Sequence, residues 1–249
     1  MSIDHKPDVR PLYGCWLQTP SPWVCEILAS IGFDAVFVDG EHGILTHESI
    51  DPIVALARSL KLQVFYRVAT ADRPHIQQAL DSGADALVLP QIRDLAQARE
   101  VTEYAKYPPL GSRGMGTPRS LNYQETPPTF VLDENRRTKC FVMIEAQKSF
   151  EDAARIAALP TVDGLFMGPY DLSLARGRGQ YQASEADRKD DEHIAIAATS
   201  AKKLLGMPAF QQSDFAFARK HRAHVITIAD DISVLVEGLK AKRETHIST

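Results

Sequence analysis

Two carboxylates of this sequence lie where a pair of neighbouring strands would end. Glu145 closes one short apolar segment and Asp171 follows the next, 26 positions later (171 minus 145). Two carboxylates at one sheet edge can share a hard divalent cation and still leave room for water and a substrate. Asp171 could instead serve as a helix cap, because the apolar residue Leu172 follows it. We predict that the pair binds Mg²⁺, Mn²⁺ or Co²⁺.

A histidine lies in a tight turn that follows another apolar segment. The turn reads Asp39-Gly40-Glu41-His42-Gly43. An aspartate that holds one tautomer of an imidazole makes it an effective proton acceptor near neutral pH. We therefore predict that His42 is a catalytic base oriented by Asp39, although a lone histidine can also be purely structural.

Arg67 ends a third apolar segment. A buried arginine needs an anionic partner, and Asp39 and Asp81 are the candidates. The same guanidinium could stabilise a developing enolate oxygen, and the two roles are compatible. No lysine lies near the C-terminal end of any apolar segment, where an amine-based aldolase would need one, since Lys139 and Lys148 fall before and after the relevant position. The chemistry therefore points to a metal rather than to an amine.

These side chains need a scaffold that brings strand ends together. Eight short and mostly continuous apolar runs alternate with helical patterns, which is typical of parallel strands covered on both faces. The runs are Tyr13–Gln18, Ala35–Asp39, Val64–Val68, Ala86–Pro90, Cys140–Glu145, Gly164–Gly168, Met207–Gln211 and Val225–Ala229. The expected helices are Ser21–Ile31, His47–Leu60, Pro74–Ser82, Leu95–Tyr107 and Ser149–Leu159.

Eight such units in 249 residues predict a single (β/α)8 TIM barrel that spans residues 1–249. In that fold the polar residues at the strand ends converge on one mouth. An open doubly wound sheet is the alternative, but its G-x-G-x-x-G signature after the first strand is absent. Two polar stretches, Pro108–Lys139 and Leu174–Glu192, interrupt the alternation and are expected to be long loops.

The composition excludes several classes of partner. The net charge of −4 provides no general attraction for nucleic acid or an anionic membrane, and no apolar stretch is long enough to cross a bilayer. Cys15, Cys25 and Cys140 are odd in number and widely spaced, which argues against a disulfide framework. The segment Met1–Pro11 is polar and lacks the apolar centre of a signal peptide. We expect a soluble cytoplasmic protein.

Several motifs together resemble the HpcH/HpaI aldolase family. They are Asp39-Gly40-Glu41-His42-Gly43, Tyr66-Arg67-Val68, the run from Ala79 to Ala84, Tyr107-Pro108-Pro109-Leu110-Gly111-Ser112-Arg113-Gly114, Ile144-Glu145 and Gly168-Pro169-Tyr170-Asp171-Leu172-Ser173. The similarity extends from about Gly14 to about Asp171 and fades afterwards. Members of this family are metal-dependent class II pyruvate aldolases, and they include 4-hydroxy-2-oxoheptanedioate aldolases and 2-keto-3-deoxy sugar acid aldolases.

The resemblance implies a role for each residue of the predicted site. Glu145 and Asp171 would bind the metal, Arg67 would contact the keto oxygen, and His42 would handle the hydroxyl proton. Backbone amides near Tyr170 and Asp171, at the start of a helix, would receive the substrate carboxylate. Two strand-end residues, Gly168 and Gln91, are further candidate substrate contacts.

The family also implies a hexamer, a trimer of dimers in which C-terminal helices are exchanged. Asp81 and the loop Gly114–Thr117 would then lie near a neighbour's active site and its substrate.

The sequence departs from the family pattern at one position near the predicted metal ligand Glu145. Met143 stands where the family often has glutamine, so water placement or acceptor preference could differ. The aldehyde cannot be identified from the sequence.

A citrate-lyase-type enzyme acting on an acyl-CoA would use a similar barrel and would need basic side chains for the CoA phosphates. A barrel that only binds a metabolite is the other alternative. The expected reaction is reversible cleavage of a 4-hydroxy-2-oxo acid into an aldehyde and either pyruvate or an analogue such as hydroxypyruvate.

Overall fold

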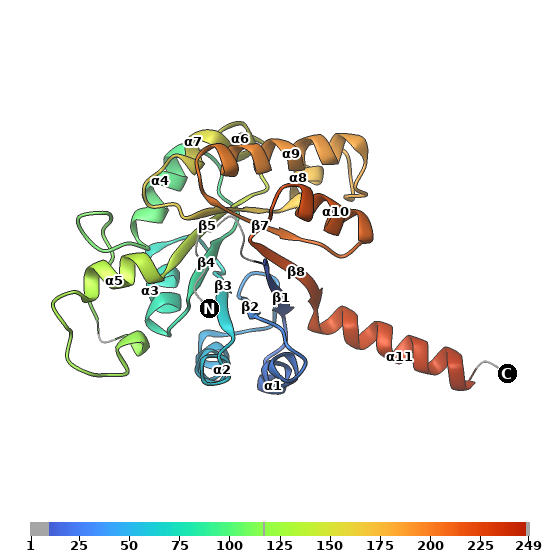
Figure 1. The fold of residues 1–249 in the computed structure, drawn as a ribbon, viewed down its shortest axis with the longest axis horizontal. Coiled ribbons are helices and arrows are strands. Elements are labelled where there is room, and N and C mark those ends of the chain that lie inside the picture. Colours follow the sequence, from blue (N-terminus) through green and yellow to red (C-terminus); the bar gives the residue numbers. More distant parts are fainter. Residues whose placement is uncertain (1–9, 117, 248–249) are drawn as a thin grey trace.

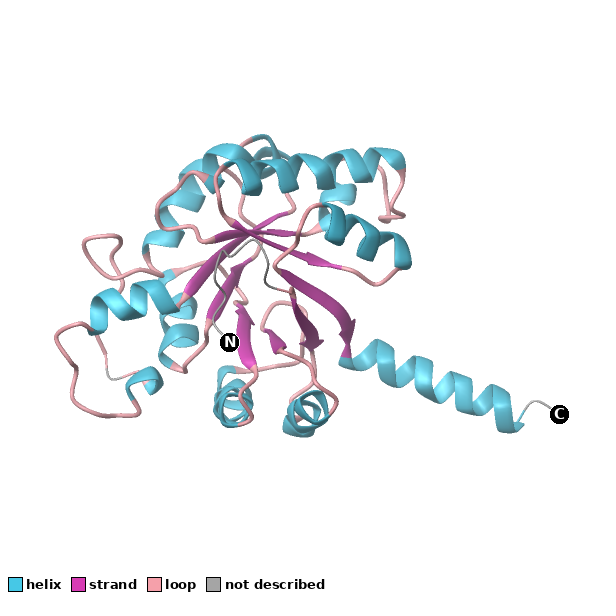
Figure 2. Ribbon diagram, in the orientation of Figure 1, coloured by secondary structure: helices cyan, strands magenta, loops and turns pink. Residues whose placement is uncertain are grey.

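The computed structural model describes residues 10–116 and 118–247, in which eight parallel strands close into a barrel (Figure 1). The prediction for Met1–Pro11 therefore falls largely outside the described residues. Figure 2 shows the strands at the centre with helices around them. The strands are β1 (Leu12–Leu17), β2 (Ala35–Asp39), β3 (Gln63–Arg67), β4 (Ala86–Leu89), β5 (Lys139–Ile144), β6 (Gly164–Met167), β7 (Leu204–Pro208) and β8 (Val225–Asp230). Each strand pairs with the next, and β8 pairs with β1, which confirms the barrel and excludes the open sheet.

The helices follow the strands in order. They are α1 (Pro22–Ser30), α2 (His47–Ser59), α3 (Arg73–Asp81), α4 (Leu95–Glu103), α5 (Phe130–Arg137), α6 (Gln147–Glu151), α7 (Ala153–Ala157), α8 (Pro169–Ala175), α9 (Glu185–Ser200), α10 (Gln212–Lys220) and α11 (Asp231–Ile247), with a 3₁₀ turn at Arg119–Leu121. No helix among the described residues has the length and apolar character needed to span a bilayer.

Aromatic rings fill the inside of the barrel. Phe37 and Phe65 stack with their ring centroids 4.3 Å apart. Gly14 faces this layer, and a Cβ atom there would lie 2.4 Å from the ring of Phe37. The interior is therefore a packed core that supports the mouth from below, as is usual in this fold.

Several expected boundaries differ from the structure. β7 begins three residues before the expected Met207, because Leu204 and Leu205 belong to the strand rather than to the preceding helix. The expected helix Ser149–Leu159 is two short helices that meet at Asp152, whose carboxylate accepts a hydrogen bond from the backbone N–H of Leu95 at 3.1 Å. The expected loop Leu174–Glu192 contains the start of α9, and Pro108–Lys139 contains α5.

Helix α11 does not cover the barrel from which it emerges. It extends away from β8 as an isolated rod (Figure 1), and none of its residues is buried. Asp231, the first residue of α11, anchors the start of the helix. Its carboxylate accepts hydrogen bonds from the backbone N–H groups of Gln18 at 3.0 Å and Thr19 at 3.1 Å. The helix thus has a defined starting point but no packing partner within the described chain.

Candidate active site

A cavity of about 330 Å³ opens at the C-terminal ends of the strands, and we call it the mouth cavity. It is lined by Trp16, Gln18, Asp39, His42, Arg67, Met143, Glu145, Phe166, Met167, Gly168, Pro169, Tyr170, Asp171, Pro208, Phe210 and Asp230. All five residues predicted to form the metal site and the acid–base group are in this set. Barrel closure therefore brings together side chains from the C-terminal ends of β2, β3 and β5, from the turns that follow β2 and β5, and from α8.

Asp39 and Arg67 form a buried ion pair between neighbouring strands. The Nε and Nη2 atoms of Arg67 donate to the two carboxylate oxygens of Asp39 at 2.8 and 2.6 Å. The pairing of Asp39 with Arg67 in the β2–β3 register explains this contact. The guanidinium also lies over the ring of Trp16, 4.5 Å from its centroid. Charge-assisted bidentate bonds fix both the position and the plane of the guanidinium. The pKa of Asp39 is lowered despite its burial, because Arg67 stabilises the carboxylate form.

His42 is held through its backbone rather than its ring. Asp39 accepts hydrogen bonds from the backbone N–H groups of Glu41 and His42, each at 3.1 Å. The carboxylate next to the imidazole is that of Glu41, with 3.8 Å between Oε2 and Nε2. The expected contact of Asp39 with the imidazole is thus replaced by its ion pair with Arg67, which occupies both carboxylate oxygens. The ring of His42 remains about half exposed at the rim of the cavity.

The turn that carries His42 depends on two glycines. A Cβ atom at Gly40 would lie 2.8 Å from the carbonyl oxygen of Arg67. One at Gly43 would lie 2.5 Å from the carbonyl oxygen of Asp39. A larger residue at Gly40 would push the turn away from β3, and one at Gly43 would clash with the turn itself, so both glycines are needed for this backbone path.

Glu145 is buried among other acidic groups. The residue is only 2 % exposed, and its Oε1 accepts a hydrogen bond from the backbone N–H of Gln91 at 2.5 Å. Burial, together with the nearby charges of Glu41 and Asp171, raises the pKa of Glu145 to about 7. A carboxylate in this position lacks a compensating positive charge, since Arg67 is already paired with Asp39 and lies 3.2 Å from Glu41.

This donor set fits a divalent metal ion. Glu145 and Asp171 follow adjacent strands and line the same cavity, and a shared cation would relieve the repulsion between them. One Oε atom of Glu41 is also buried without a hydrogen bond. Among the described residues there is no group of three or more His, Cys, Asp or Glu side chains arranged around a metal position, so a metal here would depend on two protein carboxylates together with substrate and water.

Gly168 keeps this region open. A Cβ atom at this position would lie 2.7 Å from both Cβ and Oε2 of Glu145. Because glycine has no Cβ atom, the start of α8, which carries Asp171, can pack closely against Glu145. The glycine thus lines the cavity, and its main effect is to permit the approach of the two carboxylates.

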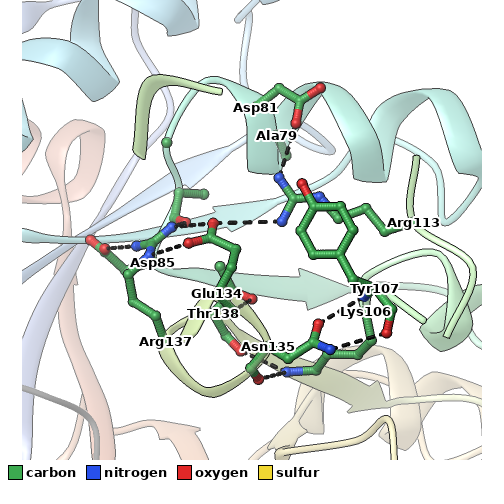
Figure 3. Close-up of polar contacts among 12 residues, drawn as sticks. Ala79, Asp81, Asp85, Lys106, Tyr107, Arg113, Glu134, Asn135, Arg137 and Thr138 are labelled. Atoms are coloured by element: carbon green, nitrogen blue, oxygen red, sulfur yellow. Dashed lines mark hydrogen bonds and ion pairs between the residues drawn. The ribbon is translucent and has the colours of Figure 1, made fainter. Parts of the chain in front are cut away.

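Two predicted substrate contacts lie elsewhere. The side chain of Gln91 is exposed and outside the cavity lining, and the residue contributes its backbone N–H to Glu145, from a left-handed backbone conformation with φ of 54°. Asp81 ends α3 at the opposite face of the barrel, where it accepts a hydrogen bond from Arg113 at 2.9 Å (Figure 3). Asp81 is therefore no part of its own chain's mouth cavity. Its proximity to a neighbour's site remains a prediction.

The sequence did not reveal the aromatic wall of the cavity. Tyr170 and Phe210 are each partly exposed and face the cavity from α8 and from the segment after β7. The prediction included Tyr170 only for its backbone amide. Phe210 was assigned to a strand, and the apolar side chain carried no signal of its own. The lining contains no lysine among the described residues.

A closed (β/α)8 barrel with paired acidic groups, an arginine and a histidine at its mouth defines an enzyme of the TIM-barrel class. The model of the HpcH/HpaI aldolase/citrate lyase family matches residues 12–237, and the chain belongs to this family of divalent-metal-dependent aldolases. The match extends well beyond Asp171, where the similarity of the motifs fades.

Relatives of known function cover almost the whole chain. A hydroxypyruvate/pyruvate aldolase of Delftia acidovorans is 31 % identical over 96 % of this chain and 90 % of its own length. A 5-keto-4-deoxy-D-glucarate aldolase of Escherichia fergusonii is 30 % identical over 90 % of this chain and 88 % of its own. The crystal structure of an HpcH/HpaI aldolase from Desulfitobacterium hafniense has a TM-score of 0.87 and 27 % identity, with 94 % of this chain and 93 % of that chain covered. The protein is thus an enzyme, an aldolase of the lyase class.

Proposed function

We propose that the enzyme cleaves 4-hydroxy-2-oxo acids reversibly into an aldehyde and pyruvate, or a close analogue such as hydroxypyruvate, with a bound Mg²⁺, Mn²⁺ or Co²⁺. The observation that carries this proposal is the joint presence of Glu145, Asp171, Arg67 and His42 around one cavity. The Delftia relative, named for hydroxypyruvate and pyruvate, supports this class of oxo acid.

Glu145 and Asp171 would hold the metal. A divalent ion there supplies Lewis-acid polarisation of the oxo acid's carbonyl group. The metal also provides the positive charge that the buried Glu145 carboxylate lacks.

Arg67 stabilises the charge that develops during cleavage. Its guanidinium is fixed by Asp39, so it can face the keto oxygen without rearranging. A preorganised cation stabilises a developing enolate oxygen more than it stabilises the neutral carbonyl group. We assign the carboxylate of the oxo acid to the backbone N–H groups of Tyr170 and Asp171, which lie in the first turn of α8 and have no partner within that helix.

His42 takes the proton of the C4 hydroxyl group, directly or through a water. The C4 oxygen then forms the aldehyde carbonyl, the C3–C4 bond breaks, and its electron pair becomes the enolate of the oxo acid. Protonation of C3 releases pyruvate. In the reverse direction the enolate adds to an aldehyde and His42 returns the proton.

The acyl-CoA lyase alternative has less support. It requires basic side chains along the cavity for the CoA phosphates. Among the described lining residues Arg67 is the only lysine or arginine, and it is already paired with carboxylates. A CoA-ester substrate tested beside the 4-hydroxy-2-oxo acids distinguishes the two reactions.

Exchanged C-terminal helices are part of the same proposal. Four apolar residues share one face of α11 because they follow the i, i+3, i+4, i+7 pattern: Ile232, Leu235, Val236 and Leu239. They are exposed, as are three residues at intervals of four along α1 and its C-cap: Trp23, Ile27 and Ile31. We propose that α11 of a second copy covers α1, in a hexamer built from such pairs. We further propose a cytoplasmic location, in keeping with three buried free cysteines.

Chelation of the metal tests the reaction. Pyruvate formation from a panel of 4-hydroxy-2-oxo acids should stop in excess EDTA and return with Mg²⁺, Mn²⁺ or Co²⁺. Glu145→Gln should weaken Mn²⁺ binding by about 100-fold in calorimetric titration, because one of two protein ligands loses its charge. Glu151→Gln, on the exposed surface of α6, is the matched control and should bind Mn²⁺ as the unaltered enzyme does. Full activity in excess chelator would refute the metal assignment.

A further inference from the structure

A buried ionic cluster lies behind the mouth cavity, between α9 and α10. Its centre is Arg188 of α9, whose Nη1 is 3.3 Å from Oδ2 of Asp191. The Nη2 atom contacts Oδ1 of Asp214 and donates to Oγ of Ser213 at 3.0 Å. The side chains of Asp191 and Asp214 are only 3 and 6 % exposed. One guanidinium thus joins two buried carboxylates on different helices.

Asp214 links the cluster to one wall of the cavity. Its Oδ2 accepts hydrogen bonds from the backbone N–H groups of Phe210 at 3.1 Å and Gln211 at 3.0 Å. The side chain of Phe210 lines the mouth cavity. One oxygen of Asp214 thus contacts Arg188, while the other fixes the backbone that carries the side chain of Phe210.

Asp191 links the cluster to the opposite aromatic side chain. Its Oδ2 accepts a hydrogen bond from the hydroxyl group of the buried Tyr181 at 2.9 Å. The ring of Tyr181 packs against that of Tyr170, with their centroids 5.3 Å apart and the planes tilted by 59°. Tyr170 lines the cavity. A continuous chain of contacts therefore runs from Tyr170 to Phe210 through Arg188.

Stability alone is a weak reason for such a cluster. Buried ion pairs can often be replaced by apolar side chains at little cost, because desolvation of the charges offsets their attraction. A cluster with defined partners does, however, impose one geometry on the segments that it joins. Here one of those segments carries Phe210, and the other holds Tyr181, whose ring packs against Tyr170 at the cavity.

We propose that Arg188 is a positioning residue that sets Tyr170 and Phe210 relative to each other, and thereby orients the aldehyde as it meets the enolate carbon. This inference rests on the proposed aldolase reaction. The groups assigned to the oxo acid and its metal are Glu145, Arg67, Asp171 and the backbone N–H groups at the start of α8, and none of them contacts Arg188 among the interactions of the described residues. The cluster reaches α8 only through the ring of Tyr170, which packs against Tyr181. Enolate formation should therefore be independent of Arg188, whereas addition to an aldehyde should depend on it.

The experiment compares Arg188→Met and Arg188→Lys with the unaltered enzyme. Deuterium exchange into the methyl group of pyruvate, followed by NMR, reports enolate formation without an aldehyde. Initial rates of addition to benzaldehyde and to formaldehyde give kcat and KM for a large and a small acceptor. Arg155→Met is the matched control, because Arg155 pairs with Asp152 at 3.0 Å on an exposed surface away from the cavity.

We expect methyl exchange in Arg188→Met to remain within about twofold of the unaltered enzyme. The kcat/KM for benzaldehyde should fall by roughly tenfold or more and that for formaldehyde by less than about threefold, since small displacements of a positioning wall affect the larger acceptor most. Arg188→Lys, which keeps one charge but cannot bridge both carboxylates in the same way, should recover part of the loss. Arg155→Met should change none of these quantities.

Backbone hydrogen exchange supplies a readout that does not depend on activity. In Arg188→Met the amides of Phe210 and Gln211 should lose protection, while β2 and β3 keep theirs. If Arg188→Met does not fold, Asp214→Asn serves instead, because the amide oxygen can still accept from Phe210 while the charge next to Arg188 is gone. In Asp214→Asn we expect the same selective fall in kcat/KM for benzaldehyde, with methyl exchange retained.

If Arg188→Met lowers the methyl exchange rate and kcat/KM for both aldehydes equally, Arg188 has only a structural role. If it lowers none of these quantities, Arg188 has no role in the reaction. Either result overturns the inference. If the unaltered enzyme shows neither methyl exchange nor addition, the aldolase proposal itself fails, which is a distinguishable outcome.

Discussion

At the residue scale, the site combines a buried, firmly held cation with a histidine that is about half exposed. Arg67 is almost fully buried and held by two hydrogen bonds to Asp39, whereas the ring of His42 lies at the rim and has no hydrogen bond to a carboxylate. A fixed guanidinium suits stabilisation of a charge that develops at one place. A rim histidine can reach a hydroxyl group that lies farther out in the cavity. The two proposed roles suit these different degrees of burial.

Replacement of His42 separates proton transfer from metal binding. His42→Ala should reduce aldol turnover by roughly 10²–10⁴-fold, the usual contribution of a general base, because the C4 hydroxyl proton loses its acceptor. Mn²⁺ affinity, measured by calorimetric titration, should remain unchanged because Glu145 and Asp171 are intact. His75→Ala, at an exposed position of α3, is the control and should retain normal turnover. Normal turnover of His42→Ala would instead assign the proton to another group.

At the element scale, α9 illustrates how a polar stretch can be an ordered part of the structure. The segment before and within this helix is rich in charge, which predicted a loop. The acidic residues are paired, however: Asp187 and Asp190 both contact Arg178, at 2.9 and 2.6 Å, and Ser184 caps the helix. The charges therefore attach α9 to the segment that follows α8 instead of keeping it in solvent.

The stability of this region should depend on pH through Asp191. Burial raises the pKa of its carboxyl group to about 6 from an ordinary value of 3.8, so the folded protein favours the protonated form. The resulting contribution to stability is complete below about pH 4 and is lost as the pH rises through about 6.

Asp191→Asn does not titrate and isolates this contribution. Between pH 4.5 and 7.5 the free energy of unfolding of the unaltered protein should fall relative to that of the variant, by on the order of 2 kcal/mol. Urea unfolding at several pH values measures the difference. A difference that is constant with pH, or that grows in the opposite direction, contradicts the assigned ionisation.

At the scale of the whole molecule, α11 and α1 each leave an apolar face uncovered in the described chain. In a closed barrel the last helix normally packs on the outside beside the first one. Here it projects away (Figure 1), and both helices present apolar faces to solvent. Exposed apolar surfaces of this kind mark sites of association. Exchange of α11 between two copies would cover both faces at once.

A charge placed on the apolar face of α11 should disrupt the assembly. The double variant Leu235→Asp and Leu239→Asp should shift the protein from an oligomer to smaller species, because buried carboxylates in an apolar contact are costly. Light scattering coupled to size-exclusion chromatography measures the mass. Ile196→Asp, on the exposed surface of α9, is the matched control and should leave the mass unchanged. A monomeric unaltered protein would refute the exchange of helices.

The sequence by itself determined the barrel, the order of its strands and the set of polar residues at its mouth. Helix and strand patterns are local, and parallel strands place their C-terminal ends on one face, so Glu145, Asp171, Arg67 and His42 could be predicted without coordinates.

The tertiary structure determined which side chains contact one another. Arg67 takes the carboxylate of Asp39, Gln91 contributes only its backbone, Asp81 faces the opposite end, and Arg188 joins the two aromatic walls. Such contacts connect residues far apart in the chain. They depend on how the barrel closes and on the distances that closure leaves between side chains, which no local pattern contains.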